Sequence, residues 1–172
     1  VGSDRPPGSQ EHFPRVMAWL DWLDALAARH HASLAKVATS DELVRAVRSG
    51  RIALLPAVEG GDQLDEPDNL RRAYERGVRS VGIVYDHHNR FGDGAMVQQG
   101  SSRIAANPHG GLSVEGRALI DEMNRLGMLI DLSQASEMTA LQAMALSRAP
   151  VIFSHSGARA LADTPRNLSD DM

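Results

Sequence analysis

The stretch Ile52-Ala-Leu-Leu-Pro-Ala-Val58, followed directly by Glu59-Gly60-Gly61, decides the fold of this chain. A continuous apolar run of strand length is typical of a strand buried on both faces, as in a parallel sheet covered by helices. The run stops at a carboxylate and two glycines, and glycine tolerates backbone conformations that other residues avoid. We therefore expect a site at Glu59 where the backbone approaches something closely, with a solvated turn glutamate as the open alternative.

Helical and strand-like segments alternate on either side of this stretch. Apolar periodicity and capping residues predict helices over 11–38, 42–48, 67–76, 113–126, 136–147 and 158–162. Further strands are predicted over 78–85, 128–132 and 150–154, and a surface loop over 95–112. Connections of this length are too long for hairpins, so the strands should be parallel with right-handed crossovers, which defines an α/β fold.

Composition narrows the class of partner. The chain has 172 residues, a formal net charge of -4 and no cysteine. Without a broad basic field, nucleic acid or an anionic membrane is not the expected partner, and a small molecule is favoured. The missing thiols exclude disulfides and a cysteine nucleophile, so any metal must be held by His, Asp or Glu. No apolar run is long enough to span a bilayer. We expect a soluble chain, periplasmic or cytoplasmic, with the compartment left open.

Polar residues gather directly after the predicted strands, where α/β folds collect their active-site groups. In chain order they are Glu59, the segment 85–89, Asp131 with Gln134, and His155. An imidazole at a strand tip is able to ligate zinc, although a hydrogen-bonded structural histidine is the commoner case. Arg166 lies in a polar tail, where its planar guanidinium could bind a carboxylate or simply face solvent.

The other histidines are not expected to bind metal. Neighbouring residues on an extended chain point in opposite directions, so the pair His87-His88 is interpreted as part of a loop. His12, His30 and His31 lie on or beside the first predicted helix and are expected to be exposed. His109 precedes a helix cap in a Pro-His-Gly-Gly turn, which we interpret as structural.

Several motifs together resemble the membrane dipeptidase (renal dipeptidase) family in content, order and spacing. They are Val58-Glu-Gly-Gly61, Gly111-Leu-Ser113, Glu122-Met-Asn-Arg-Leu-Gly-Met128, Ile130-Asp-Leu-Ser133, Pro150-Val-Ile-Phe-Ser-His-Ser156, Arg166-Asn and Asp170-Asp171. The resemblance covers the chain from about residue 40 to the end, and the first helix more loosely. It implies part of a (β/α)8 barrel of the TIM type with about four βα units visible. We expect a single, incomplete domain over 1–172, with an N-terminal helical segment at about 11–50.

The resemblance also implies a zinc-dependent hydrolase that cleaves dipeptides or related small amides and uses two zinc ions. Glu59 corresponds to the carboxylate that bridges both metals, His155 to a ligand of one zinc, and Arg166 to the arginine that binds the substrate's free carboxylate. The strand with a His-x-Asp metal pair is expected before Val1, and a strand with a further aspartate after Met172. A homodimer is left open.

Two positions depart from the family pattern. Gln134 replaces a histidine ligand of the Asp-Leu-Ser-His motif, and an amide is a poorer zinc ligand than imidazole. Tyr85 replaces a substrate-binding histidine, although its hydroxyl could still donate a hydrogen bond to a developing oxyanion. These substitutions favour the alternative of a catalytically degenerate homologue that binds or otherwise processes a peptide-like metabolite.

Overall fold

The computed structural model describes residues 12–64, 66–96 and 108–172. The chain forms two compact units. The first comprises the chain up to Val58 together with Gln63–Ser80, and the second comprises Glu59–Asp62 and Val81–Met172. The predicted loop residues 97–107 lie outside the described residues. The expectation of a single domain stays a prediction.

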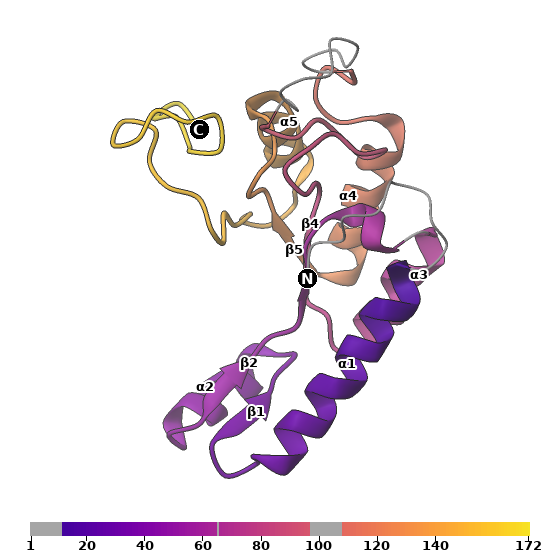
Figure 1. Ribbon diagram of the computed structural model, residues 1–172, viewed down its shortest axis with the longest axis vertical. Helices are drawn as coiled ribbons and strands as arrows, with labels where there is room; N and C mark the ends of the chain where they lie inside the picture. The colour runs from indigo at the N-terminus through magenta and orange to yellow at the C-terminus, as the bar shows by residue number, and fades with distance from the viewer. Residues whose placement is uncertain (1–11, 65, 97–107) are drawn as a thin grey trace. The chain divides into compact units, whose positions relative to one another are not determined.

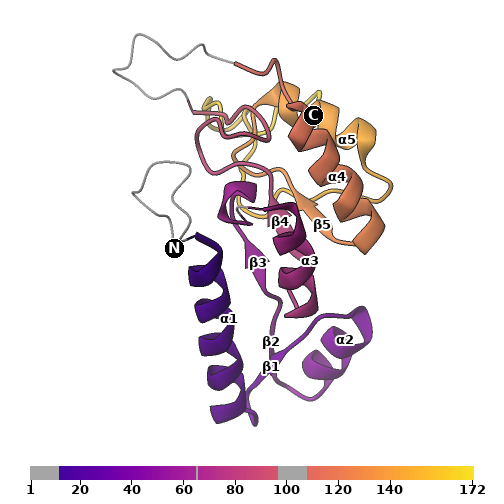
Figure 2. The same ribbon diagram turned by 90° about the vertical axis from the view of Figure 1, so that its right-hand side faces the viewer.

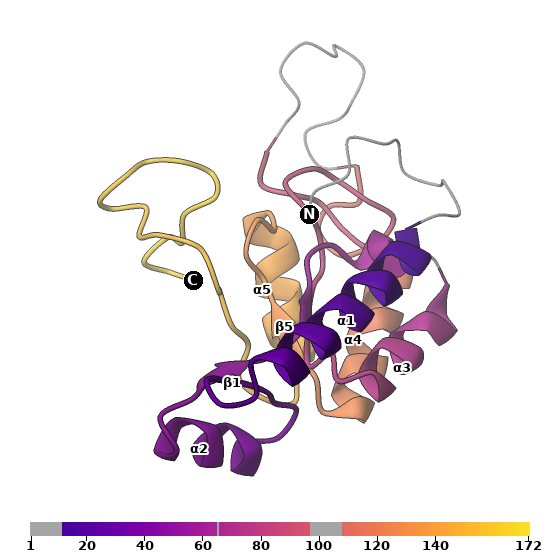
Figure 3. The same cartoon turned by 60° about the horizontal axis from the view of Figure 1, so that its bottom comes forward.

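The first unit is built around a short parallel strand pair. It contains α1 (His12–Arg29), β1 (Leu34–Lys36), α2 (Ser40–Arg48), β2 (Ile52–Leu54) and α3 (Pro67–Glu75). β1 and β2 pair in register from Leu34↔Ile52 to Lys36↔Leu54. α1 and α2 lie on opposite sides of this pair (Figures 1 and 3). Apolar side chains of this unit, such as Leu20, Val37 and Leu70, are fully buried and form its core.

The second sheet leads to the candidate site. Its strands are β3 (Ala57–Val58), β4 (Ser80–Gly82) and β5 (Leu129–Asp131), in the order β3-β4-β5. An isolated parallel bridge joins Asp131 to Ile152. In the second unit α4 (Val114–Leu126) and α5 (Glu137–Leu146) run side by side (Figure 2). The parallel pairing confirms the predicted α/β class.

Helix ends follow local chemistry, as predicted. The side chains of Ser113 and Ser136 accept hydrogen bonds from the backbone N–H groups of Gly116 and Thr139, capping α4 and α5. Thr39 and Glu42 form a reciprocal capping box at the start of α2. Gly127 ends α4 with a φ of 69°, a left-handed conformation that glycine adopts without strain.

Two predicted elements in the first half of the chain differ from the structure. The helix predicted over 11–38 ends at Arg29, and β1 occupies its last part, because a short apolar segment pairs with β2. The predicted strand 52–58 is divided into β2 and β3 around Leu55-Pro56, since proline has no N–H for a sheet ladder. Ile52 is also 64% exposed, so burial of this run on both faces was wrong.

Near the C-terminus, the segment 150–154 makes only one bridge, and 158–162 forms turns instead of a helix. Neither predicted element is therefore present in its predicted form. Among the residues whose structure is described, no helix has the length and apolar character needed to cross a membrane.

Candidate active site

Glu59 leaves β3 and enters a tight Glu-Gly-Gly turn. Gly60 has a φ of 89°, and a Cβ added to Gly61 would lie 2.9 Å from Phe91 Cδ2. The N–H of Gly61 donates to the carbonyl of Ile83 at 3.2 Å, which holds the turn against the chain that follows β4. Side chains larger than hydrogen would disturb this packing, so the two glycines fix where the Glu59 carboxylate emerges.

The side chains of Glu59, Gln134 and His155 meet at the strand ends. Glu59 Oε1 lies 3.0 Å from His155 Nε2, and both side chains are 42% exposed. Gln134 Nε2 is within hydrogen-bond distance of both atoms, 2.7 Å from His155 Nε2 and in a short contact with Glu59 Oε1. We call these three residues the Glu59 cluster. The structure thus brings together the residue pair expected to bind metal and the residue at the replaced ligand position.

The amide of Gln134 has a single orientation that satisfies its neighbours. Its Oε1 accepts a hydrogen bond from the backbone N–H of Asp86 at 2.6 Å, while the two hydrogens on Nε2 face Glu59 and His155. Exchanging Oε1 and Nε2 would place two donors against each other at Asp86 and two acceptors at Glu59. Gln134 is buried and has a φ of 69°, a conformation that costs a non-glycine residue roughly 1 to 2 kcal/mol. The surrounding hydrogen bonds offset that strain.

Asp131 organises the opposite side of His155. Its Oδ1 accepts from the backbone N–H groups of Ser133 at 3.0 Å and Ser154 at 3.2 Å, and its Oδ2 accepts from Ser154 Oγ. Burial raises the pKa of Asp131, but these hydrogen bonds outweigh it and leave the pKa below its usual value. Ser154 Oγ also lies 2.7 Å from His155 Nδ1. The Ser154 hydroxyl therefore contacts the imidazole at Nδ1, and the Asp131 carboxylate holds that hydroxyl in place.

Asp86 and Arg166 form the next part of the site. Asp86 Oδ1 lies 3.5 Å from Arg166 Nε, a loose ion pair between partly exposed side chains. Asp86 has a φ of 53°, and its carbonyl accepts from the N–H of Met96 at 3.0 Å. Tyr85 precedes it and is 40% exposed. Through its N–H to Gln134 and its carboxylate to Arg166, Asp86 links the Glu59 cluster to the predicted substrate-binding arginine.

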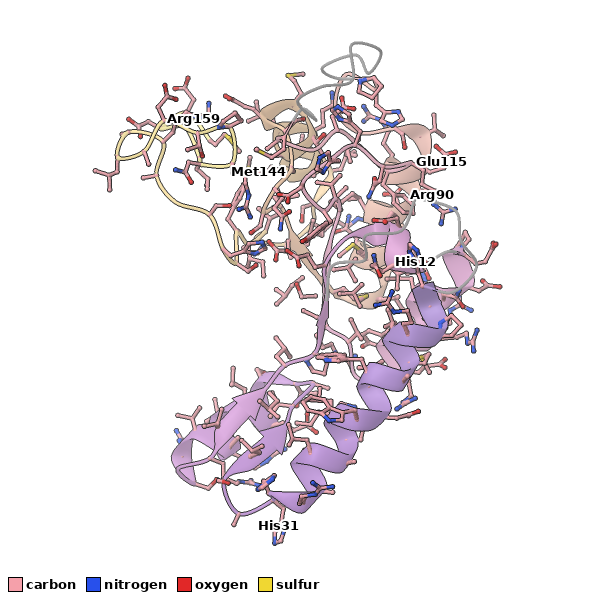
Figure 4. The ribbon with its side chains drawn as sticks, in the orientation of Figure 1. His12, His31, Arg90, Glu115, Met144 and Arg159 are labelled. Atoms are coloured by element: carbon pink, nitrogen blue, oxygen red, sulfur yellow. The ribbon has the colours of Figure 1, made fainter. Side chains whose placement is uncertain are left out.

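The segment that carries Arg166 is held to the start of α5. Arg159 Nη1 lies 3.0 Å from Glu137 Oε2, and Ser169 Oγ donates to Glu137 Oε1 at 3.2 Å (Figure 4 labels Arg159). The hydrogen bonds from Arg159 and Ser169 hold the pKa of Glu137 below its usual value. The side chain of Asn167 accepts from the N–H of Gly157 and donates to the carbonyl of Ala162, closing the loop on itself.

Sequence patterns missed some of these residues. Asp86 was expected near the site only as part of the segment 85–89, and Ser154 only as part of a motif; neither was given a role, because their roles depend on partners far along the chain. Asp93 is completely buried and accepts from the backbone N–H groups of His109 and Gly111. No sequence pattern indicated this role.

The remaining histidines mostly match expectation. His30 and His31 are exposed (Figure 4 labels His31), and His109 serves its turn through a 2.8 Å contact with the Asn89 carbonyl. His12 is 3% exposed, so its expected exposure was wrong. His88 is not simply a loop residue either, since its Nδ1 lies 3.5 Å from the buried Asp93 carboxylate.

The donor set fits part of a metal site. In tetrahedral zinc coordination with bonds of about 2.0 Å, neighbouring ligand atoms are about 3.3 Å apart, close to the 3.0 Å between Glu59 Oε1 and His155 Nε2. Across residues 12–64, 66–96 and 108–172, no group of three or more His, Cys, Asp or Glu side chains gathers for a metal. Glu59 and His155 thus fit as two ligands of a site that needs further donors.

An α/β chain with a carboxylate, an imidazole and an arginine near its strand ends is typical of the barrel hydrolases that use metal ions. A sequence profile of the membrane dipeptidase family (peptidase family M19) matches residues 6–172. The chain therefore belongs to the membrane dipeptidase family, a family of metallopeptidases with a barrel fold, as its motifs predicted.

Relatives and solved structures agree with this assignment. Dipeptidase verJ of Clonostachys rogersoniana is 38% identical over 94% of this chain and 40% of its own length. Dipeptidase tcpJ of Claviceps purpurea is 41% identical over 76% of this chain and 29% of its own. The structure of the probable dipeptidase PvdM from Pseudomonas aeruginosa matches 88% of this chain and 38% of that chain, with a TM-score of 0.82 and 31% identity.

A metallo peptidase from Rhodobacter sphaeroides, solved with a phosphinate mimic of the dipeptide L-Ala-D-Ala, matches 90% of this chain and 43% of that chain, with a TM-score of 0.76 and 30% identity. The chain thus spans less than half the length of each of these four proteins.

Proposed function

We propose that the protein containing this chain is a zinc-dependent hydrolase that cleaves dipeptides or related small amides. The observation that carries the proposal is the 3.0 Å approach of Glu59 Oε1 to His155 Nε2 at the strand ends of a membrane dipeptidase family chain. Two zinc ions are expected, with the remaining ligands outside this stretch of sequence. Zinc, when bound, would polarise the peptide carbonyl and make water a stronger nucleophile near neutral pH.

Each residue of the site has a part in this proposal. Glu59 presents two carboxylate oxygens, enough to bridge two cations. His155 offers Nε2 as a neutral nitrogen donor, the form in which imidazole binds zinc. Tyr85 is placed beside Asp86, where its phenol is proposed to donate a hydrogen bond to the oxygen that gains negative charge.

Arg166 is proposed to bind the substrate's free carboxylate. The contact between its guanidinium and the Asp86 carboxylate supports this role, because the group already lies beside a carboxylate. The pair is loose and more than a third of the Arg166 side chain is exposed, so an incoming carboxylate displaces Asp86 at little cost. A dipeptide carries such a carboxylate at one end and its scissile bond a short distance away.

The second candidate function is binding or other processing of a peptide-like metabolite without hydrolysis. The contacts of Gln134 favour it, because the amide hydrogens face the two atoms that would otherwise bind metal. Metal analysis of the whole protein, combined with a dipeptide hydrolysis assay, separates the candidates. If the protein is a hydrolase, it should bind zinc and turn over dipeptides. Glu59→Gln should abolish that turnover, and Glu115→Gln on the exposed face of α4 should leave it unchanged. Full occupancy by zinc without turnover, or no zinc at all, leaves only the second candidate.

The role of Arg166 has its own test. Arg166→Ala should raise KM for a dipeptide with a free carboxylate far more than for its C-terminal amide, because only the former loses a charge-assisted pair. Arg148→Ala, at an exposed position just after the end of α5, is the matched control. Equal weakening of both substrates would remove Arg166 from the site. The expected homodimer is a separate proposal, which sedimentation of the whole protein tests.

A further inference from the structure

Consecutive hydrogen bonds connect His155 Nδ1 to the Asp131 carboxylate. His155 Nδ1 lies 2.7 Å from Ser154 Oγ, and Ser154 Oγ in turn bonds to Asp131 Oδ2. The backbone N–H of His155 donates to Ser133 Oγ at 3.1 Å, which fixes the residue as well as its ring. These contacts lie on the side of the imidazole that faces away from Glu59, whose carboxylate approaches Nε2.

Counting the available hydrogens identifies the donor in each of these hydrogen bonds. The Asp131 carboxylate has no hydrogen to donate, so the single hydroxyl hydrogen of Ser154 must go to Asp131. Ser154 Oγ is then an acceptor toward His155, and Nδ1 must carry the hydrogen of the neutral imidazole. Nε2 is left with its lone pair, directed at the Glu59 cluster.

The contacts on the other side of the ring do not select a tautomer by themselves. Gln134 Nε2 has two hydrogens and two neighbours, Glu59 Oε1 and His155 Nε2. Its orientation is fixed by Asp86, so it would donate to a lone pair on Nε2, whereas Glu59 Oε1, 3.0 Å from the same Nε2, would accept a hydrogen carried there. An Nε2–H tautomer places donor against donor at Gln134, and a lone pair on Nε2 places acceptor against acceptor at Glu59. The choice of tautomer is therefore made by Ser154 and Asp131.

We propose that Asp131 is a positioning residue that, through Ser154, holds His155 in the tautomer whose Nε2 lone pair faces Glu59. The role of that lone pair as a metal donor rests on the proposed function, whereas the tautomer itself does not. Metal-binding histidines commonly donate their second ring N–H to a carboxylate or hydroxyl, which orients the ring and raises its basicity. Here a serine is inserted between the imidazole and the carboxylate, so Ser154 is required for Asp131 to act.

Asp131→Asn separates this role from a purely structural one. The asparagine carbonyl still accepts the backbone N–H groups of Ser133 and Ser154, but its NH2 group would donate to Ser154 Oγ. Ser154 would then give its hydrogen to His155 Nδ1, and the hydrogen of the ring would move to Nε2. A structural role alone predicts an unchanged tautomer in any folded variant.

The test uses the whole protein with 15N-labelled histidine, treated with chelator and kept at about pH 8.5, where imidazole is neutral. The His155 nitrogen signals, assigned with His155→Gln, should show Nδ1 protonated in the wild type and Nε2 protonated in Asp131→Asn. Ser154→Ala should lose the preference, and Ser154→Thr should retain it because the hydroxyl remains. Should Asp131→Asn fail to fold, the Ser154 pair decides the matter alone.

Zinc affinity provides the second readout. Asp131→Asn should weaken zinc binding by about 10- to 100-fold, the usual effect of losing an outer partner of a ligand. Asp121→Asn on the exposed face of α4 makes the same charge change and should leave affinity unchanged. Protonated Nδ1 in both Asp131→Asn and Ser154→Ala would overturn the proposal. A tautomer that responds as expected in a protein that binds no zinc would instead count against the proposed function alone.

Discussion

Replacing Gln134 by leucine should strengthen zinc binding at Glu59 and His155. Leucine has a volume similar to that of glutamine, so it fits the buried position, but it has no hydrogen-bond donor. In the structure the Gln134 amide donates to both predicted ligand atoms and is held in that orientation by the N–H of Asp86. A cation shared by Glu59 and His155 must displace those two hydrogen bonds. Leucine removes this competition.

The size of the effect follows from the two bonds. A typical intramolecular hydrogen bond contributes about 0.5 to 1.5 kcal/mol net, so two bonds oppose the cation by about 1 to 3 kcal/mol. Since 1.4 kcal/mol is a factor of ten, the range corresponds to roughly 5- to 150-fold in Kd. The side chains of Glu59 and His155 are 42% exposed, and water replaces part of what is lost. We therefore expect the lower part of this range, about 5- to 30-fold tighter binding.

A competition titration against a chromogenic chelator measures this change on the whole protein. Gln142→Leu is the matched control, because Gln142 is also an amide that bonds both a backbone N–H and a carbonyl, those of Leu112 and Gly110, away from the Glu59 cluster. Gln134→His should bind more tightly still, since imidazole is a stronger zinc ligand than a hydrocarbon or an amide. Weaker zinc binding in Gln134→Leu than in the wild type would show that the amide oxygen is itself a ligand and would refute the reasoning.

Three further predictions concern the support of the site. Gly94→Ala should destabilise the fold by several kcal/mol, because a Cβ there would lie 2.3 Å from the Asp86 carbonyl oxygen; denaturant unfolding measures it, and an unchanged midpoint would contradict the close approach. Because the folded pKa of Glu137 is lowered, the stabilisation by its bonds to Arg159 is present above the ordinary glutamate pKa and is lost as pH falls through the lowered value. The protection of residues 157–169 against hydrogen exchange, relative to the unfolded chain, should therefore fall in acid, and in Glu137→Gln it should be low at every pH. Ser113→Ala should cost about 1 kcal/mol by removing the α4 cap, and Ser113→Asp should retain it in thermal unfolding.

Features set by a few neighbouring residues were predictable from the sequence. The caps at Ser113 and Ser136 and the glycine ends of α2 and α4 depend on bonds within a single turn, so a local pattern is sufficient. Strand boundaries depend on distant partners. β1 was absorbed into a predicted helix because only its pairing with β2, which the sequence does not show, makes Leu34–Lys36 a strand.

The site was predictable to the level of its strand ends and no further. Parallel strands deliver their following residues to one edge, which is why Glu59, Gln134 and His155 could be expected together. The orientation of the Gln134 amide was not predictable, because it is determined by a backbone N–H 48 residues away and by a left-handed conformation at residue 134. The role of Ser154 was not predictable for the same reason, since its importance lies in joining Asp131 to His155.

The hydrogen-bond network around His155 has one side that a cation would disturb and one that it would leave intact. On the Asp131 side, Ser154 donates to Asp131 and accepts from His155 Nδ1, which is the arrangement that a metal-binding imidazole needs. Zinc at Nε2 would therefore require no rearrangement of Ser154 or Asp131. On the Gln134 side the amide hydrogens must turn away before the lone pair of Nε2 is available. Of the two sides, only the one at residue 134 opposes a cation, so we expect residue 134 to decide how tightly Glu59 and His155 bind zinc.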